Sequence, residues 1–246
     1  MTEANVAPLE VIGVSAAYGK KQVLADVSFA LRPGEVFGLI GLNGVGKTTL
    51  IRSVLGLRQT AGKISLFGQP NTVAASRRNL VYLPERFHPS PQLTGWEYLG
   101  ILLAYFDQRV DRDRARTIAA GLDLDPAAID RPIRTYSKGM GQKLGLVGTF
   151  LVDAPLMILD EPMSGLDPRA RVLLKDRLLE SRGQGRCIFF SSHILADIEE
   201  ICDRIGIIHA MRVIFLGTPG ELMTRTAVPT LERAFLAALE DVERAA

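Results

Sequence analysis

The chain has 246 residues, with 29 basic and 27 acidic side chains, so its formal net charge is +2. A hydrophobic fraction of 47% beside a charged fraction of 23% is ordinary for a globular protein and excludes a disordered or collagen-like chain. The balanced charge argues against a dedicated nucleic-acid binder, and two cysteines, Cys187 and Cys202, are too few for a disulfide scaffold.

The apolar stretches of the chain are short. The longest, such as residues 144–152 and 98–106, fall far below the ~20 residues that a transmembrane helix needs. Residues 1–8 lack the basic segment and apolar run of a secretory signal. We therefore expect a cytoplasmic protein without a membrane span of its own.

The first part of the chain predicts strands and then a helix. Alternating apolar positions predict strands over 9–14 and 27–31, and a Pro33-Gly34 turn follows the second. Residues 35–40 predict a strand that runs into a glycine-rich loop, and residues 47–57 have helical periodicity.

The later segments predict an α/β fold. Residues 87–134 have a mostly helical pattern and look like an insertion. Two short apolar runs, 156–159 and 188–190, are typical of buried parallel strands, and the amphipathic segment 168–182 between them is typical of a crossover helix. The sequence therefore predicts a parallel sheet covered by helices on both faces.

The clearest chemical motif is the loop Gly41-Leu42-Asn43-Gly44-Val45-Gly46-Lys47-Thr48-Thr49, which matches the phosphate-binding loop. Glycines let the backbone amides of such a loop turn toward phosphate oxygens, so the expected cradle includes Gly41, Asn43, Gly44 and Gly46. We expect Lys47 to neutralise the β- and γ-phosphates, Thr48 to bind Mg²⁺ and Thr49 to reach the α-phosphate. The alternative is a glycine-rich turn with a chance lysine, and the strand before and helix after argue against it.

Two further strands end in polar residues. Asp160 and Glu161 follow the run 156–159, at the strand end where open α/β sheets bind ligands. We expect Asp160 to hold Mg²⁺ through water and Glu161 to polarise an attacking water. His193 ends the next strand in the same way. Taken alone, the acids fit an ordinary turn and the histidine fits a structural role; with the phosphate loop, they predict one site.

From Tyr18 to about Pro219 the chain resembles the ATP-binding subunits of ABC transporters, with motifs in the family's order. Tyr136-Ser137-Lys138-Gly139-Met140-Gly141-Gln142 is similar to the family signature, and Ser164-Gly165-Leu166-Asp167 is similar to its D-loop. His193 stands at the place of the switch histidine. The resemblance implies that Tyr18 stacks on adenine and that Asp167 belongs to the nucleotide site. Without it, a strand-end surface tyrosine is an equal interpretation of Tyr18.

The resemblance also implies a partner copy. Ser137 precedes a helix-like run, 138–151, so it can cap a helix start that favours an anion. In the family this anion is the γ-phosphate of ATP held by the other subunit of a head-to-tail sandwich. Ser137 and Gly139 are therefore expected at the partner subunit's ATP. The alternative is a capping serine with no ligand.

Two departures from the family pattern stand out. The signature reads Ser-Lys-Gly-Met where Ser-Gly-Gly-Gln is commonest, and Glu85 stands where the family has the Q-loop glutamine. A glutamate can approach Mg²⁺ through oxygen but loses the amide donor. Both features resemble the branch with ABC-2 exporter partners, and a plain surface role for Glu85 is the alternative.

The fold implied by the resemblance is α/β: a P-loop NTPase core with a parallel sheet, an N-terminal antiparallel β subdomain and an inserted helical subdomain. We expect one domain over residues 1–246, with the helical subdomain at about 87–150 and a C-terminal helical extension at about 220–246. Within this extension, residues 231–246 predict an amphipathic helix that caps the domain or contacts a partner.

The expected function is ATP binding and hydrolysis with Mg²⁺, through catalytic Lys47, Glu161 and His193. The resemblance implies a homodimer at the inner face of the cell membrane that powers transport, of the export kind, through separate transmembrane permease subunits. No nucleic-acid partner is expected. The alternatives are an ABC ATPase acting on nucleic acids and a regulatory subunit that binds ATP without hydrolysis. A GTPase is disfavoured because the chain has no Asn-Lys-x-Asp motif.

Overall fold

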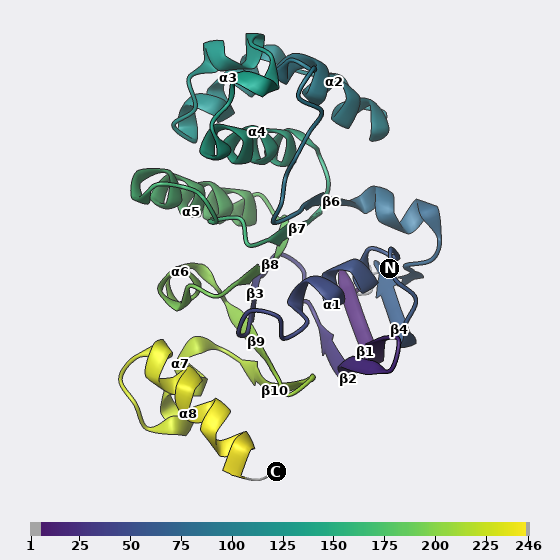
Figure 1. Cartoon of the computed structure of the whole chain (residues 1–246), viewed down its shortest axis with the longest axis vertical. Coiled ribbons are helices and arrows are strands. Elements are labelled where there is room, and N and C mark those ends of the chain that lie inside the picture. The colour runs from purple at the N-terminus through teal and green to yellow at the C-terminus, as the bar shows by residue number, and fades with distance from the viewer. Residues whose placement is uncertain (1–5, 245–246) are drawn as a thin grey trace, which may run out of the picture.

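The computed structural model describes residues 6–244, and its N-terminal part is a four-stranded antiparallel sheet (Figure 1). The strand order is β2-β1-β4-β5, with bounds β1 Leu9–Tyr18, β2 Lys21–Ala30, β4 Ala61–Leu66 and β5 Gln69–Pro70. The strand expected over 9–14 is part of the longer β1, and the strand expected over 27–31 lies in β2 except for Leu31; a two-residue turn joins β1 to β2. The prediction that residues 1–8 do not form a secretory signal concerns a segment that lies mostly outside the described residues.

A second sheet of six strands forms the centre of the molecule, in the order β10-β9-β3-β8-β7-β6. Five of its strands are parallel, and β10 runs antiparallel to β9. Their bounds are β3 Val36–Ile40, β6 Leu80–Leu83, β7 Leu156–Asp160, β8 Cys187–Ser192, β9 Arg204–His209 and β10 Arg212–Gly217. Every residue of β3, β7 and β8 is buried, which confirms the parallel strands expected there.

Both faces of the central sheet are covered, and neighbouring residues of a strand point to opposite faces. Phe189 packs in the apolar cluster shared with α1 (Lys47–Val54) and the antiparallel sheet, whereas Phe190 packs in the cluster on the other face. Figure 1 shows α5 and α6 on that second face. This two-sided burial explains why these strands read as continuous apolar runs.

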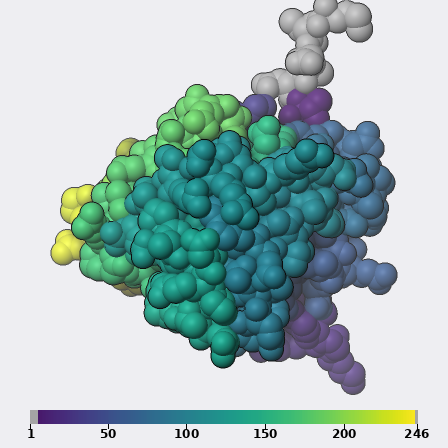
Figure 2. All heavy atoms as spheres, turned by 90° about the horizontal axis from the view of Figure 1, so that it is seen from above, coloured from purple at the N-terminus to yellow at the C-terminus, as the bar shows by residue number. Residues whose placement is uncertain are grey.

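Most of the remaining helices lie where the sequence predicted helical segments, and the helix over Leu195–Ile201 was not predicted. Their bounds are α2 Gly95–Tyr105, α3 Arg112–Gly121, α4 Lys138–Leu151, α5 Pro168–Gly183, α6 Leu195–Ile201, α7 Pro219–Thr226 and α8 Leu231–Arg244. Helices α2 to α4 form one end of the molecule, and Figure 2 views this end with their side chains across its centre. The subdomain limits at 87, 150 and 220 stay predictions.

Some local expectations differ from the structure. The helix expected over 47–57 ends at Val54, because Gly56 has φ 68°, a left-handed conformation that stops a helix. The antiparallel pair of β9 and β10 and the short α6 lie where we predicted no element, whereas α7 lies at the start of the predicted C-terminal helical extension. The helix predicted over 231–246 is described as far as Arg244, and its last two residues lie outside the described part.

The order of the strands brings three segments of the chain to one edge. β8 lies between β3 and β7, with Ile40 paired to Ser192 and Asp160 paired to Ser191. The residues that follow these strands are the phosphate loop, Glu161 and His193. The topology therefore places all three predicted groups at the same carboxyl edge of the sheet.

Candidate functional site

The glycine-rich loop joins β3 to α1 and leaves the start of this helix open. Gly44 and Gly46 have φ 79° and 115°, which other residues rarely adopt. Gly46 occupies the N-cap position, and no described side chain caps the helix. A Cβ on Gly46 would lie 3.2 Å from the carbonyl oxygen of Val23, so the backbone needs glycine here. An uncapped helix start with free amides is a site for an anion.

Lys47 is buried in the centre of this loop, with 6% of its surface exposed. Its Nζ donates to the carbonyl oxygens of Gly41 at 2.7 Å and Leu42 at 3.5 Å. The same nitrogen lies 3.4 Å from Oε1 of Glu161, which is also buried. The ammonium group is therefore held at the position where a phosphate in the loop would meet it.

The acids after β7 are fixed by β8. Ser191 Oγ donates to Asp160 Oδ1 at 2.6 Å and accepts from the backbone amide of Glu161 at 3.0 Å. Glu161 has φ 49°, uncommon for a residue with a side chain, and this turn aims its carboxylate back toward Lys47. Its second oxygen, Oε2, lies 2.8 Å from Nδ1 of His193, whose side chain is 48% exposed. Glu161 thus connects the loop lysine to the histidine.

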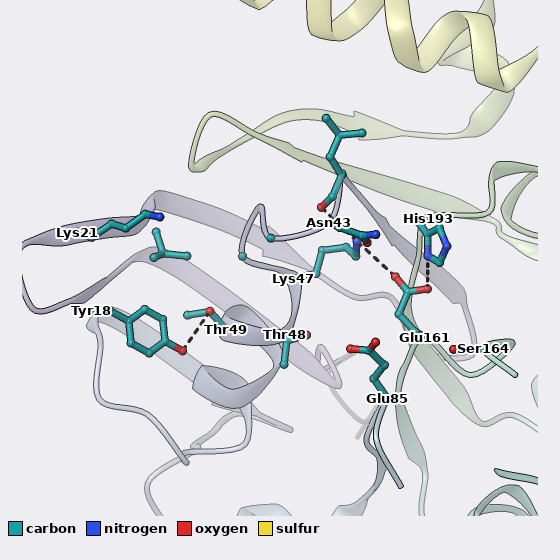
Figure 3. Close-up of a pocket in the computed structure, with 14 residues that line it drawn as sticks. Tyr18, Lys21, Asn43, Lys47, Thr48, Thr49, Glu85, Glu161, Ser164 and His193 are labelled. Carbon is teal, nitrogen blue, oxygen red and sulfur yellow. Dashed lines mark hydrogen bonds and ion pairs between the residues drawn. The ribbon is translucent and has the colours of Figure 1, made fainter. Parts of the chain in front are cut away.

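These groups surround a cavity of about 550 Å³ (Figure 3). The predicted residues that line it are Tyr18, Asn43, Gly44, Gly46, Lys47, Thr48, Thr49, Glu85, Glu161 and His193. Lys21, Val23, Leu42 and Ser164 also line it and were not predicted as site residues, although Leu42 belongs to the phosphate loop and Ser164 to the stretch similar to the D-loop. The cavity runs from an aromatic side chain at one end to carboxylates at the other.

Tyr18 forms the aromatic end of the cavity and is 49% exposed. Its hydroxyl lies 3.5 Å from Oγ1 of Thr49, a long contact. This contact, with smaller contributions from Arg58 and Arg52, lowers the pKa of Tyr18 below its ordinary value. An exposed ring at the edge of a phosphate loop is suited to stack on a flat ligand.

Two of the predicted Mg²⁺ ligands, Thr48 and Glu85, line the cavity, and the third, Asp160, is the last residue of β7. Asp160 is 1% exposed, and among the described residues its Oδ2 has no hydrogen-bond partner. A buried carboxylate oxygen without a partner is unfavourable, and a cation in the cavity would satisfy it. Residues 6–244 contain no group of three or more His, Cys, Asp or Glu arranged to hold a metal alone. Mg²⁺ bound with a nucleotide needs only one or two protein ligands besides phosphate and water, so Thr48 and Asp160 fit such an ion.

Five predicted residues are not among the described residues that line the cavity: Gly41, Asp160, Ser137, Gly139 and Asp167. Ser137 is exposed and caps α4, accepting from the amide of Met140 at 3.2 Å. A Cβ on Gly139 would lie 3.2 Å from the carbonyl oxygen of Gly165, so the signature lies against the 164–167 stretch. Asp167 caps α5 through the amide of Ala170, and this hydrogen bond lowers its pKa. Any contact of these residues with a nucleotide stays a prediction.

A parallel α/β core with this loop, and with acids on the neighbouring strand, defines a P-loop nucleotide-binding protein. The ABC transporter family matches residues 24–164, and the chain belongs to this family. Its relatives include an uncharacterised ABC transporter ATP-binding protein of Synechocystis, 40% identical over 83% of this chain and 59% of the relative. The Nod factor export ATP-binding protein I of Rhizobium leguminosarum is 35% identical over 87% of this chain and 70% of its own length.

A solved ATP-binding subunit of an ABC transporter has the same fold. The two structures superpose with a TM-score of 0.87, and their sequences are 33% identical. The match covers 94% of this chain and 98% of the solved one. The chain spans 59% and 61% of the length of two cyanobacterial relatives. Within residues 6–244, no helix has both the length and the apolar character that crossing a membrane requires.

Proposed function

We propose that the chain binds and hydrolyses ATP as the engine of a membrane transporter. The observation that carries this proposal is Glu161, held between Lys47 Nζ at 3.4 Å and His193 Nδ1 at 2.8 Å beside the open start of α1. A carboxylate in this position can act on a water molecule next to a phosphate in the loop.

The contacts of Glu161 indicate how nucleotide would prepare the site. Without a phosphate, Lys47 and Glu161 neutralise each other. The γ-phosphate would take over the ammonium group of Lys47, which leaves Glu161 Oε1 free to accept a hydrogen bond from water. His193 holds the other oxygen and thereby fixes the direction of the carboxylate. Lys47 would thus exchange its ion pair with Glu161 for an ion pair with the γ-phosphate of ATP.

In the reaction, the oxygen of the oriented water bonds to the γ-phosphorus and gives a proton to Glu161, while the bond from the γ-phosphorus to the bridging oxygen breaks and ADP and phosphate form. Mg²⁺, held by Thr48 and by Asp160 through water, would offset the charge of the phosphate oxygens. Glu85 lines the cavity beside Thr48 and Glu161 in Figure 3 and is a candidate for the same ion, with a plain surface role as the alternative. Tyr18 would stack on the adenine at the far end.

The wider assembly also belongs to the proposal. Ser137 is exposed, Gly139 is half-buried, and neither lines the chain's own cavity, which favours a head-to-tail dimer in which they meet the partner's ATP. The relatives named for Nod factor export favour the export direction. We propose a homodimer bound to transmembrane permease subunits at the inner face of the membrane, with no nucleic-acid partner.

Replacing Glu161 with glutamine tests the proposed reaction. The amide keeps the shape but loses the charge that acts on water, so we expect phosphate release to fall about 100- to 10,000-fold while ATP still binds. The matched control is Glu232→Gln, an exposed position in the first turn of α8, which should hydrolyse at the parent rate.

Hydrolysis by Glu161→Gln at the parent rate would show that Glu161 does not have this role. A parent protein that binds ATP but releases no phosphate would instead favour the regulatory subunit.

A further inference from the structure

Arg58, which the proposed reaction does not use, is stacked on Tyr18. Its guanidinium carbon lies 3.7 Å from the centre of the tyrosine ring, well inside the ~6 Å range of a cation–π contact. Arg58 Nη2 also donates to the carbonyl oxygen of Ala17, the residue before Tyr18 at the end of β1. Two contacts therefore hold the guanidinium against this strand end.

This stacked position has an energetic cost. Within the described part of the chain, Arg58 Nε is buried and has no hydrogen-bond partner, so it has lost water without replacement. The contacts with the ring and with Ala17 have to offset this loss. Arg58 therefore has a defined position on this surface loop, because its contacts with the ring and with Ala17 outweigh the lost hydrogen bond of Nε.

The two faces of the Tyr18 ring have different surroundings. Tyr18 lines the cavity together with Lys21 and Val23, whereas Arg58 is not among the described residues that line it. The absence of Arg58 from the lining indicates that it covers the ring face directed away from the cavity, and the 49% exposure of Tyr18 indicates that the other face is accessible. The long contact from the hydroxyl to Thr49, at 3.5 Å, is too weak to set the ring plane by itself.

We propose that Arg58 is a positioning residue for the base of the bound nucleotide. It holds the Tyr18 ring from behind so that the free face receives a purine, and its charge draws electron density from the ring toward itself. A ring that is less negative on its free face stacks more favourably on another π-system. The inference rests on the proposed binding of ATP and concerns the base alone, because Arg58 contacts no part of the phosphate loop in the described structure.

A double-mutant cycle tests this inference. The Kd of Mg²⁺-ATP and of Mg²⁺-tripolyphosphate, which has no base, is measured by calorimetry for the parent, Arg58→Gln, Tyr18→Leu and the double variant. We expect Arg58→Gln to weaken ATP binding on the order of two- to fivefold and to leave tripolyphosphate unchanged. In the Tyr18→Leu background the same change should have no effect on either ligand.

Two further variants complete the test. Arg58→Lys keeps a cation that can stand over the ring, so its ATP affinity should lie between those of the parent and Arg58→Gln. Arg78→Gln removes an equally charged side chain that pairs with Asp107 on the surface, and it should bind both ligands like the parent. Thermal melting checks that each variant is folded.

Several outcomes would overturn the inference. Equal loss for ATP and tripolyphosphate would mean that Arg58 supports the loop and not the base, and tighter ATP binding by Arg58→Gln would mean that it competes with the base. An unchanged Kd in Arg58→Gln, with a parent that binds ATP, would overturn the inference alone. A parent that does not bind ATP would overturn the proposed function as well.

Discussion

Single residues at the candidate site depend on partners far away in the chain. Glu161 has a left-handed backbone, which costs on the order of 1–3 kcal/mol at a residue with a side chain. Its amide regains part of this energy by donating to Oγ and to the carbonyl oxygen of Ser191. This strained backbone conformation directs the carboxylate of Glu161 toward Lys47 and His193.

The environments of the two cysteines predict how reactive their thiols are and how the stability of the protein depends on pH. Burial raises the pKa of Cys187 to about 12 and that of Cys202 well above its ordinary value. Both thiols should therefore stay protonated and react slowly with iodoacetamide at pH 8.5 in the folded protein. In the unfolded chain Cys187 loses its proton near pH 9.0, whereas in the folded protein it keeps the proton up to about pH 12. The free energy of unfolding should therefore decrease as the pH rises above about 9.

Mass spectrometry of alkylated protein measures the first effect, and urea unfolding at rising pH measures the second. The protein unfolded in urea is the control and should take up two labels. Labelling of the folded protein as fast as the unfolded one would contradict the burial of these thiols.

At the scale of secondary-structure elements, a charged side chain of α4 connects this helix to the end of α3 and to the start of α5. Lys143 on α4 is buried, and its Nζ lies 2.8 Å from the carbonyl oxygen of Asp123 and 3.5 Å from Oδ2 of Asp167. Asp123 follows α3 in a left-handed conformation, and Asp167 begins α5. This lysine therefore ties the signature helix to the segment that follows Glu161.

Replacing Lys143 with methionine should loosen this junction. The variant leaves the carbonyl of Asp123 without its charged donor, and we expect a loss of about 1–3 kcal/mol in the free energy of unfolding. ATP hydrolysis should fall as well, because Ser137 lies on the same helix. Urea unfolding is the measurement, with Lys63→Met, an exposed lysine of β4, as the control. Equal midpoints for Lys143→Met and the parent would contradict the role of this contact.

For the whole molecule, one chain provides two separate parts of the proposed ATP site. The cavity with Lys47 and Glu161 is at the carboxyl edge of the central sheet, and the start of α4 with Ser137 is exposed outside it. Two head-to-tail copies would bring the two parts together. ATP would then shift the equilibrium toward the closed dimer because it binds that state better.

Ser137→Arg tests this arrangement in the Glu161→Gln background, where ATP should persist. A large cation at the dimer contact should block closure, so we expect monomers with ATP bound, whereas Glu161→Gln alone should form ATP-dependent dimers. Light scattering after gel filtration measures the mass. The control is Thr117→Arg on the exposed face of α3, which should still dimerise. ATP-driven dimers of the Ser137→Arg variant would contradict the sandwich.

The sequence by itself was enough to predict the phosphate loop and the buried strands 156–159 and 188–190, because each depends on neighbouring residues. It also predicted the family, because each of the family's motifs is a short local pattern and their order is read directly along the chain. The capping role of Ser137 was also local, since its partner Met140 is three residues away. The helix end at Val54 was missed because the helical periodicity of the sequence continues to residue 57.

Only the tertiary structure decided which strands are neighbours and which side chains meet. The order β3-β8-β7 places Lys47, Glu161 and His193 within contact, although they are far apart in the chain. The stacking of Arg58 on Tyr18 and the link from Lys143 to Asp167 likewise join distant segments. Such contacts depend on how sheets and helices pack, and packing is a property of the whole fold that no local pattern contains.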